Sequence, residues 1–189
     1  VLRESGARTI GDFGCGDGAL TAALLADTAF DRVVAMDVSA RALRQAARRL
    51  RPDRMPEARR DRLRLIQSAL TYRDERLAGL DAAVLMEVIE HVDPERLVAV
   101  ERAVFGFAAP GTIVVTTPNA EHNAEYGLPE GALRHPDHRF EWTRAEFSSW
   151  ARRVAAAYGY DVRLRPVGAE SPAGAPTQMA VFTRAEAAA

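Results

Sequence analysis

Short apolar runs alternate along this chain with longer segments in which apolar residues recur every three or four positions. The apolar runs predict five strands, at Arg8–Phe13, Arg32–Asp37, Leu63–Gln67, Asp81–Met86 and Thr112–Thr117. The periodic segments predict helices near Ala19–Leu25, Ala40–Leu50 and Pro94–Phe107, the last with Asp93 as N-cap and Pro94 at its first position. Strands that alternate with helices are typical of βαβ units. The pattern therefore predicts an α/β fold with a doubly wound, mostly parallel sheet.

The pattern changes after Thr117. The segment from Pro118 to Trp142 has little periodicity and holds three of the four histidines, and long loops in compact domains are usually functional. Thr143 and Glu146 then form a predicted capping box at the start of a helix. Two more strands follow, at Tyr160–Pro166 and Gln178–Thr183, and the last is expected to be antiparallel. We expect one domain over residues 1–184, with residues 185–189 as a disordered tail.

Composition restricts the possible classes of protein. The 189 residues carry a formal net charge of −1, so overall charge predicts neither a nucleic-acid partner nor a membrane surface. The single cysteine, Cys15, excludes an internal disulfide framework and is typical of a reducing cytoplasm. No apolar run approaches the roughly 20 residues of a membrane span. The chain begins almost directly on a strand, so we expect it to be a domain excised from a longer protein.

A glycine-rich loop carries the first candidate chemistry. Gly14 and Gly16 follow the first strand directly, where they allow a ligand to approach the backbone and the start of a helix closely. Asp37 ends the next strand, where a carboxylate can bind both hydroxyls of a ribose. Asp12, just before the loop, would repel a pyrophosphate but attract an ammonium group. These residues, together with Ser68, predict a site for S-adenosylmethionine; the alternative is a plain strand-to-helix turn.

Three potential metal ligands follow the fourth strand. Glu87, Glu90 and His91 stand at i, i+3 and i+4, so on a helical turn they would share one face at the carboxyl end of the sheet. His138 would reach the same crevice from the long loop. Two carboxylates and two imidazoles suit Mn2+ or Mg2+, and the absence of a thiolate disfavours structural zinc. The alternative is a polar turn at the start of a helix.

Two other loop histidines compete with His138 for this role. His135 lies close to it in the sequence, and His122 is a third candidate. Arg134, Arg139, Phe140 and Trp142 surround His138 and would either meet a terminal nucleotide or anchor the loop to the core.

The motifs together resemble one narrow family. Asp12 to Gly18 with Asp37 is similar to the first motifs of Rossmann-like class I methyltransferases. The segments Glu87–Asp93, Thr117–Asn123 and Asp137–Thr143 resemble the RNA 3′-terminal ribose 2′-O-methyltransferases, which act on small RNAs in plants and animals and in RNA repair in bacteria. The resemblance implies that Glu87, Glu90, His91 and His138 bind Mg2+ or Mn2+.

The expected reaction follows from this resemblance. The enzyme would transfer a methyl group from S-adenosylmethionine to the 2′-OH of the last nucleotide of an RNA, with the metal activating that hydroxyl. The bacterial relatives have an additional amino-terminal half and work with an RNA end-healing and ligating partner. Two alternatives are a methyltransferase for a small-molecule hydroxyl and a non-catalytic module that binds the cofactor or a partner protein. The role of general base stays open between His91 and His138.

Arginines are concentrated between the second and third predicted strands. Residues 41–64 contain ten Arg and three acids, a local charge of 10 − 3 = +7. This segment either binds phosphates or is a solvated helix face and loop.

Overall fold

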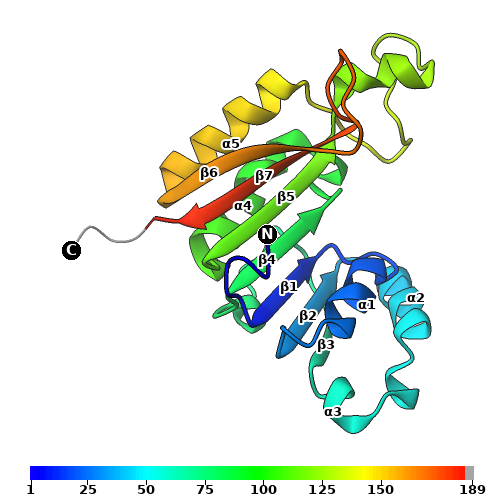
Figure 1. Ribbon diagram of the computed structural model, residues 1–189, viewed down its shortest axis with the longest axis vertical. Helices are drawn as coiled ribbons and strands as arrows, with labels where there is room; N and C mark the ends of the chain where they lie inside the picture. The colour runs from blue at the N-terminus through cyan, green and yellow to red at the C-terminus, as the bar shows by residue number, and fades with distance from the viewer. Residues whose placement is uncertain (186–189) are drawn as a thin grey trace.

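The computed structural model describes residues 1–185, and the other residues of the predicted tail lie outside this range. One seven-stranded sheet has the order β3-β2-β1-β4-β5-β7-β6. Its parallel strands are β1 (Thr9–Phe13), β2 (Arg32–Asp37), β3 (Leu63–Gln67), β4 (Ala82–Met86) and β5 (Thr112–Pro118). The last two strands, β6 (Tyr160–Val167) and β7 (Thr177–Arg184), form an antiparallel pair, and β7 is antiparallel to β5 (Figure 1). The predicted doubly wound sheet is thus confirmed.

Helices cover both faces of the sheet. On one face, α1 (Ala19–Ala26) and α2 (Ala40–Leu50) pack over β1, β2 and β3, with Ile10, Leu25 and Val33 in the shared core. On the other face lie α4 (Leu97–Glu101), the π-helical segment Arg102–Ala108 and α5 (Arg144–Tyr158). A short helix, α3 (Glu57–Arg60), precedes β3. Side chains of β1, β2, β4 and β5 point alternately to the two faces of the sheet, and most are buried. Helices on both faces are therefore needed to cover them.

Two predicted helix starts had different outcomes. The Thr143–Glu146 capping box is present at the start of α5, as predicted. Pro94 occupies the first position of a 3-10 turn, Pro94–Arg96, that leads into α4, and Asp93 is the N-cap residue of this turn, as predicted. Its side chain makes no capping hydrogen bond and instead lies 3.3 Å from Nε of Arg139, on the long loop. The carboxylate of Asp93 therefore forms an ion pair with Arg139 and makes no hydrogen bond to the first N–H groups of the helical segment.

The fold brings the candidate motifs to one edge. β1 and β4 are neighbours in the sheet, and the connections leave them in opposite directions, β1 toward β2 and β4 toward β5. The glycine loop follows β1 and the Glu87–His91 segment follows β4, so both lie at the carboxyl edge where the strand order reverses. Open α/β sheets bind their ligands at such a switch point. None of the helices in residues 1–185 is both long and apolar enough to cross a membrane.

Candidate active site

A cavity of about 790 Å3 opens at the carboxyl edge of β1, β2 and β4. Of the residues predicted to bind a cofactor, Gly14, Gly16, Asp37 and Ser68 line it. Glu87 and His91 line the same cavity, so the structure joins the predicted cofactor loop and the predicted metal segment in one site.

The glycine loop has the backbone shape that its composition predicts. Gly14 and Gly16 have φ values of 80° and 54°, a region that favours glycine. A Cβ on Gly14 would lie 2.7 Å from Cγ2 of Val88, whereas a Cβ on Gly16 would meet nothing within 4 Å. The first glycine therefore allows the loop to pack against the metal segment, and the second leaves room in the cavity. Asp37 accepts hydrogen bonds from the backbone N–H groups of Gly16 at 2.9 Å and Ser39 at 2.8 Å.

Asp12 lies beneath the loop and does not line the cavity. Its carboxylate is 2% exposed and accepts a hydrogen bond from Oγ1 of Thr21 in α1 at 2.5 Å. Burial raises the pKa of Asp12 to about 6, and the Thr21 hydrogen bond opposes this only in part. In this structure Asp12 ties the end of β1 to α1, and its contact with an ammonium group stays a prediction.

The predicted helical face at Glu87, Glu90 and His91 is only partly present. A single 3-10 turn, Ile89–His91, replaces an α-helix, and Glu87 precedes it in the left-handed region at φ 55°. Thr116 of β5 stabilises this unusual backbone, because its carbonyl and its hydroxyl both accept the N–H of Glu87, at 3.2 and 3.1 Å. The hydroxyl also donates to Oε1 of Glu87 at 2.8 Å. Glu87 is therefore positioned by β5 and not by a shared helical face.

Glu90 is the most enclosed of the acids in the site. Its side chain is completely buried, and Oε2 accepts a hydrogen bond from Thr117 at 3.0 Å. Its other oxygen, Oε1, is buried without any hydrogen-bond partner. Burial raises the pKa of Glu90 to about 8, and the nearby charge of Glu87 adds to the effect. A buried carboxylate oxygen that lacks a partner is costly unless a cation or a proton satisfies it.

Two imidazoles lie near the carboxylate of Glu90. Glu90, His91 and His138 each offer a ligand atom within 4.8 Å of the other two. The ring centroids of His91 and His138 are 4.8 Å apart. Burial lowers the pKa of His91, so its neutral form, which can coordinate a metal, is favoured. Carboxylate and imidazole donors around an unpartnered oxygen fit a divalent cation such as Mn2+ or Mg2+.

The competing histidines lie elsewhere or make other contacts. His135 is close to His138, at 5.5 Å between ring centroids, but its Nδ1 accepts the backbone N–H of Asp137. His122 is buried away from the group, with Nδ1 3.1 Å from the carbonyl oxygen of Gly174. In the described part of the chain, only His138 of these three belongs to the group with Glu90 and His91.

Glu141, for which the sequence analysis predicts no role, orients His138. Its Oε1 lies 2.5 Å from Nδ1 of His138 and accepts the backbone N–H of Arg134 at 2.7 Å. Its Oε2 accepts the side-chain amide of Asn123 at 2.6 Å. Burial alone would raise the pKa of Glu141, but these hydrogen bonds outweigh it and hold the pKa below its usual range. The available signals were its position three residues after His138 and its place inside the Asp137–Thr143 segment that carries the resemblance.

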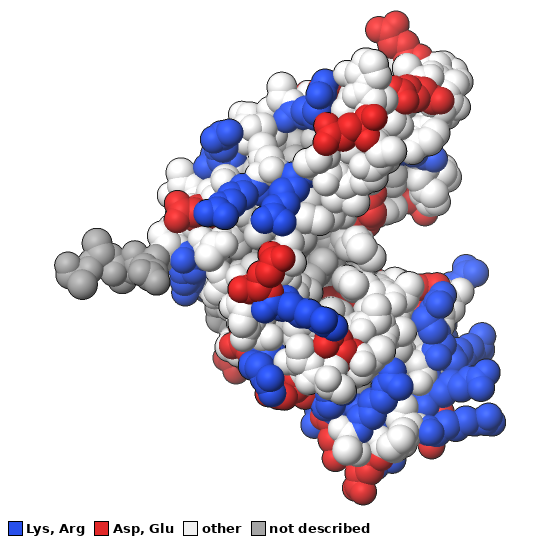
Figure 2. Space-filling model, viewed as in Figure 1, with Lys and Arg blue, Asp and Glu red and all other residues white. Residues whose placement is uncertain are grey.

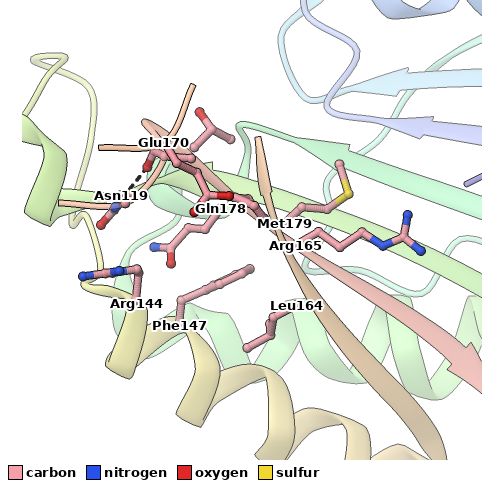
Figure 3. Close-up of a pocket in the computed structure, with 12 residues that line it drawn as sticks. Asn119, Arg144, Phe147, Leu164, Arg165, Glu170, Gln178 and Met179 are labelled. Atoms are coloured by element: carbon pink, nitrogen blue, oxygen red, sulfur yellow. Dashed lines mark hydrogen bonds between the residues drawn. The ribbon is translucent and has the colours of Figure 1, made fainter. Parts of the chain in front are cut away.

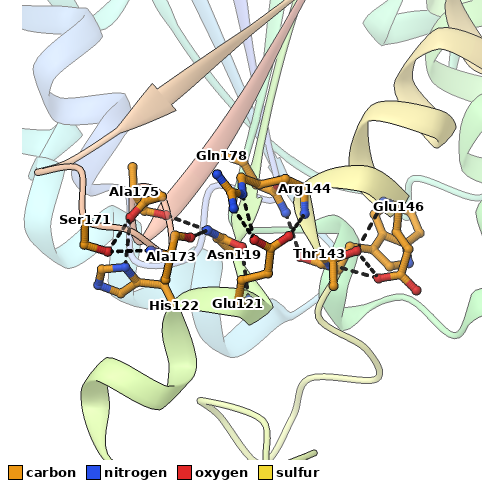
Figure 4. A network of polar contacts seen from close by, with 12 residues as sticks. Asn119, Glu121, His122, Thr143, Arg144, Glu146, Ser171, Ala173, Ala175 and Gln178 are labelled. Carbon is orange, nitrogen blue, oxygen red and sulfur yellow. Dashed lines mark hydrogen bonds and ion pairs between the residues drawn. The ribbon is translucent and has the colours of Figure 1, made fainter.

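Polar contacts hold the long loop against the β6–β7 hairpin. Figure 4 shows Asn119 bridging to the hairpin, where its amide donates to the carbonyl oxygens of Ala173 and Ala175. Glu121 pairs with Arg144 at the start of α5 (Figure 4). Arg134 of the long loop also contacts the hairpin, because its Nη1 donates to the carbonyl oxygen of Pro176 at 2.7 Å. Arg134 and Asn119 therefore stabilise the loop in this structure.

The aromatic residues of the loop serve as anchors. The ring centroids of Phe140 and Trp142 are 4.3 Å apart, and both side chains pack against the main core. Trp142 also contacts Trp150 of α5. Of the two roles predicted for them, the structure shows the anchoring one.

A second cavity, of about 260 Å3, lies between α5 and the β6–β7 hairpin (Figure 3). Asn119 and Arg144 line it, but both already hold the partners described above. Phe147 and Leu164 supply its apolar walls. Among the described residues this lining contains no cluster of metal ligands, so the larger cavity is the candidate active site.

Comparison with known proteins identifies the family. A model of the family described as "Methyltransferase domain" matches residues 12–114. A crystal structure of the methyltransferase domain of bacterial CtHen1 superposes with a TM-score of 0.88 at 48% identity, covering 96% of this chain and 93% of that one. The chain belongs to the Hen1 family of methyltransferase domains. Membership confirms the resemblance given by the sequence motifs and the Rossmann-like class I fold.

Longer relatives share this domain. The Mus musculus protein named small RNA 2′-O-methyltransferase is 36% identical over 187 residues, which are 94% of this chain and 46% of the mouse protein. The chain thus spans less than half the length of that relative. A chain of the Pnkp1/Rnl/Hen1 RNA repair complex is 27% identical to this chain and superposes with a TM-score of 0.74. The match covers 97% of this chain and 39% of that one.

Proposed function

We propose that this domain transfers a methyl group from S-adenosylmethionine to the 2′-OH of the 3′-terminal nucleotide of RNA, in a reaction that depends on Mn2+ or Mg2+. The observation that carries this proposal is the unpartnered Oε1 of Glu90, buried beside His91 and His138. These residues, with Glu87, line or adjoin the cavity that Gly16 and Asp37 also line. A methyl donor and a hydroxyl held near the metal ligands would therefore meet in one cavity.

The residues of the site have separate tasks. Gly16 leaves space for the cofactor, and Asp37 lies where it can accept hydrogen bonds from ribose hydroxyls. Glu87, Glu90, His91 and His138 would hold the divalent cation, which supplies the positive charge that lowers the pKa of a nearby hydroxyl. Holding the terminal ribose close to the methyl group supplies proximity, the main requirement of a direct transfer. His91 and His138 are the two candidates for accepting the proton.

We also propose that this domain acts in bacterial RNA repair. Support comes from the similarity to a chain of the Pnkp1/Rnl/Hen1 RNA repair complex. In that setting an RNA end-healing and ligating protein would be the partner.

A transfer assay tests the proposed reaction. The purified chain is incubated with isotope-labelled S-adenosylmethionine, Mn2+ and a short RNA, with a matched RNA whose terminal nucleotide is 2′-deoxy. We expect label in the first RNA only, and none after chelation of the metal. Transfer only to small phenols or acids would indicate a small-molecule methyltransferase. Cofactor binding without transfer to any acceptor would indicate a non-catalytic module.

A further inference from the structure

Four arginines form a stripe along α2. Arg41, Arg44, Arg48 and Arg51 are all exposed, and their spacing of three, four and three residues places them on one side of the helix and its C-cap. The opposite side of α2 contributes Ala46 and Leu50 to the core. We call these four residues the α2 arginine stripe.

Several other arginines of this segment have polar partners, and the members of the stripe do not. Arg49 pairs with Asp17, and Arg62 donates to the carbonyl oxygens of Asp27 and Phe30. Within residues 1–185, no member of the α2 arginine stripe makes an ion pair or a side-chain hydrogen bond. The structure thus distinguishes the four exposed arginines of the stripe from arginines of the same segment, such as Arg49 and Arg62, whose side chains hold other parts of the fold.

Helix stability does not explain the stripe. The first turn of α2 contains no acidic residue and instead carries Arg41, although cations are unfavourable at the positive end of the helix dipole. Arg44 and Arg48 stand at i and i+4, where like charges repel each other. A bound polyanion would remove both penalties.

The stripe begins at the rim of the candidate active site. Ser39 and Ala42, at the start of α2, line the same cavity as His91 and Glu87. Figure 2 shows arginine side chains gathered along the edge of the molecule where α2 lies, below the hollow between its upper and lower parts. From Arg41 to Arg51 a helix rises about 15 Å. This length covers several phosphates, because charges on one strand of a duplex recur every 3.4 Å or so along its axis.

We propose that the α2 arginine stripe binds the phosphate backbone of the RNA whose 3′ end enters the cavity. The inference rests on the proposed function, since it names the surface that holds the rest of that substrate. Guanidinium groups without partners suit phosphates, and such contacts add affinity without reading the sequence. The stripe therefore gives a domain of net charge −1 a local surface for RNA.

Binding of a fluorescent RNA of roughly 20 nucleotides, measured by anisotropy with S-adenosylhomocysteine present, tests this surface. The variant R41Q/R44Q/R48Q is compared with the control R102Q/R163Q/R165Q, which removes the same charge from exposed residues of the π-helical segment and β6. We expect at least a tenfold loss of affinity in the stripe variant and a salt dependence of log Kd that is shallower by about two units. The control should stay within twofold of the unchanged chain.

Methyl transfer provides a second readout. In the stripe variant, KM for the long RNA should rise at least tenfold with kcat nearly unchanged. KM for an RNA of about four nucleotides should rise less, because this RNA contacts fewer of the arginines. Equal affinities of the stripe and control variants for the long RNA overturn the inference. Capture of anionic lipid vesicles by the stripe with no loss of RNA binding in the variant would assign it to a membrane surface and also overturn it. If the chain binds RNA through the stripe but methylates none, the proposed reaction fails and the binding surface stands.

Discussion

Nδ1 of His138 lies 2.5 Å from Oε1 of Glu141, a carboxylate whose side chain is fully buried. Because a carboxylate can only accept, this contact places the proton of His138 on Nδ1 and leaves Nε2 available as a metal ligand. Glu141 also receives hydrogen bonds from Arg134 and Asn123, so one carboxylate ties the orientation of His138 to the fold of the long loop.

Replacing Glu141 by Gln should weaken metal binding. Both carboxylate oxygens of Glu141 accept hydrogen bonds, but the nitrogen of a Gln side-chain amide cannot. His138 should therefore lose its fixed orientation. Loss of such a supporting contact typically costs about 10–100-fold in metal affinity. Mn2+ affinity measured by electron paramagnetic resonance checks this, with the exposed Glu130→Gln as control. S-adenosylmethionine affinity should stay unchanged in both. Equal Mn2+ affinity of the two variants would show that Glu141 serves the loop alone.

Glu90→Ala and His91→Ala should abolish methyl transfer while leaving the cofactor bound. Both residues belong to the candidate metal group, whereas Gly16 and Asp37 line the part of the cavity proposed to hold the cofactor. Isothermal titration with S-adenosylmethionine and the transfer assay separate the two effects. The same titration with Mn2+ should lose its signal in both variants. Failure of these variants to bind the cofactor would mean that the metal and cofactor sites are misassigned.

Asp12→Asn should stabilise the ligand-free protein at pH 8 but not at pH 4. Burial raises the pKa of Asp12 to about 6, above its usual value of about 4 in an unfolded chain. The folded protein therefore holds a proton that the unfolded chain releases, and stability falls as pH rises from about 4 to about 6. Two pKa units correspond to about 2–3 kcal/mol. Asn keeps an oxygen for the Thr21 hydroxyl without the charge.

Thermal unfolding at the two pH values measures this effect. Asp161→Asn is the control, since Asp161 is exposed and its carboxylate makes no side-chain hydrogen bond within residues 1–185. The gain in Tm for Asp12→Asn should appear only at the higher pH. Cofactor affinity of the same variant tests the predicted ammonium contact, which requires the carboxylate to be charged. An equal change of Tm at both pH values would rule out the buried charge as its cause.

The centre of the sheet could be predicted from the sequence because β1, β2, β4 and β5 are buried on both faces and consist largely of apolar residues. Strands such as β2, Arg32–Asp37, and β3, Leu63–Gln67, match the prediction at both ends. The antiparallel edge was also predicted, although β7 is longer than expected. Asp93 occupies the predicted N-cap position, but its side chain makes no capping hydrogen bond because it pairs with Arg139, a distant residue that only the fold brings near.

The sequence predicted which residues form the candidate site better than it predicted their conformations and contacts. Spacing placed Glu87 on a helical face, but hydrogen bonds to Thr116 of a different strand hold it in a left-handed conformation instead. Glu141 had no visible role because its importance depends on contacts with Asn123, 18 residues earlier. Asp12 was expected at the cofactor, and its burial against Thr21 could not be read from the loop motif. Long-range contacts of this kind carry no local periodic signal.

Gly14 and Val88 couple the cofactor loop to the metal segment, and a double-mutant cycle can measure this coupling. Gly14→Ala should destabilise the protein in two ways: the left-handed backbone costs about 1–2 kcal/mol for a residue with a Cβ, and the new methyl would lie 2.7 Å from Cγ2 of Val88. Gly16→Ala is the matched control, because its φ is also positive but its Cβ would meet nothing within 4 Å.

Truncating Val88 to Ala should relieve the collision and leave the backbone cost. The double variant Gly14→Ala/Val88→Ala is therefore expected to be more stable than the sum of its single variants predicts, by about 1 kcal/mol or more. Urea unfolding of the ligand-free proteins gives the four free energies of the cycle. Gly16→Ala combined with Val88→Ala should be additive, since those side chains would not touch. A coupling energy near zero for the Gly14 pair would mean that the loop and the metal segment do not pack against each other at this point, and the Gly14–Val88 contact would then not help to hold the spacing between the two halves of the cavity that direct methyl transfer requires.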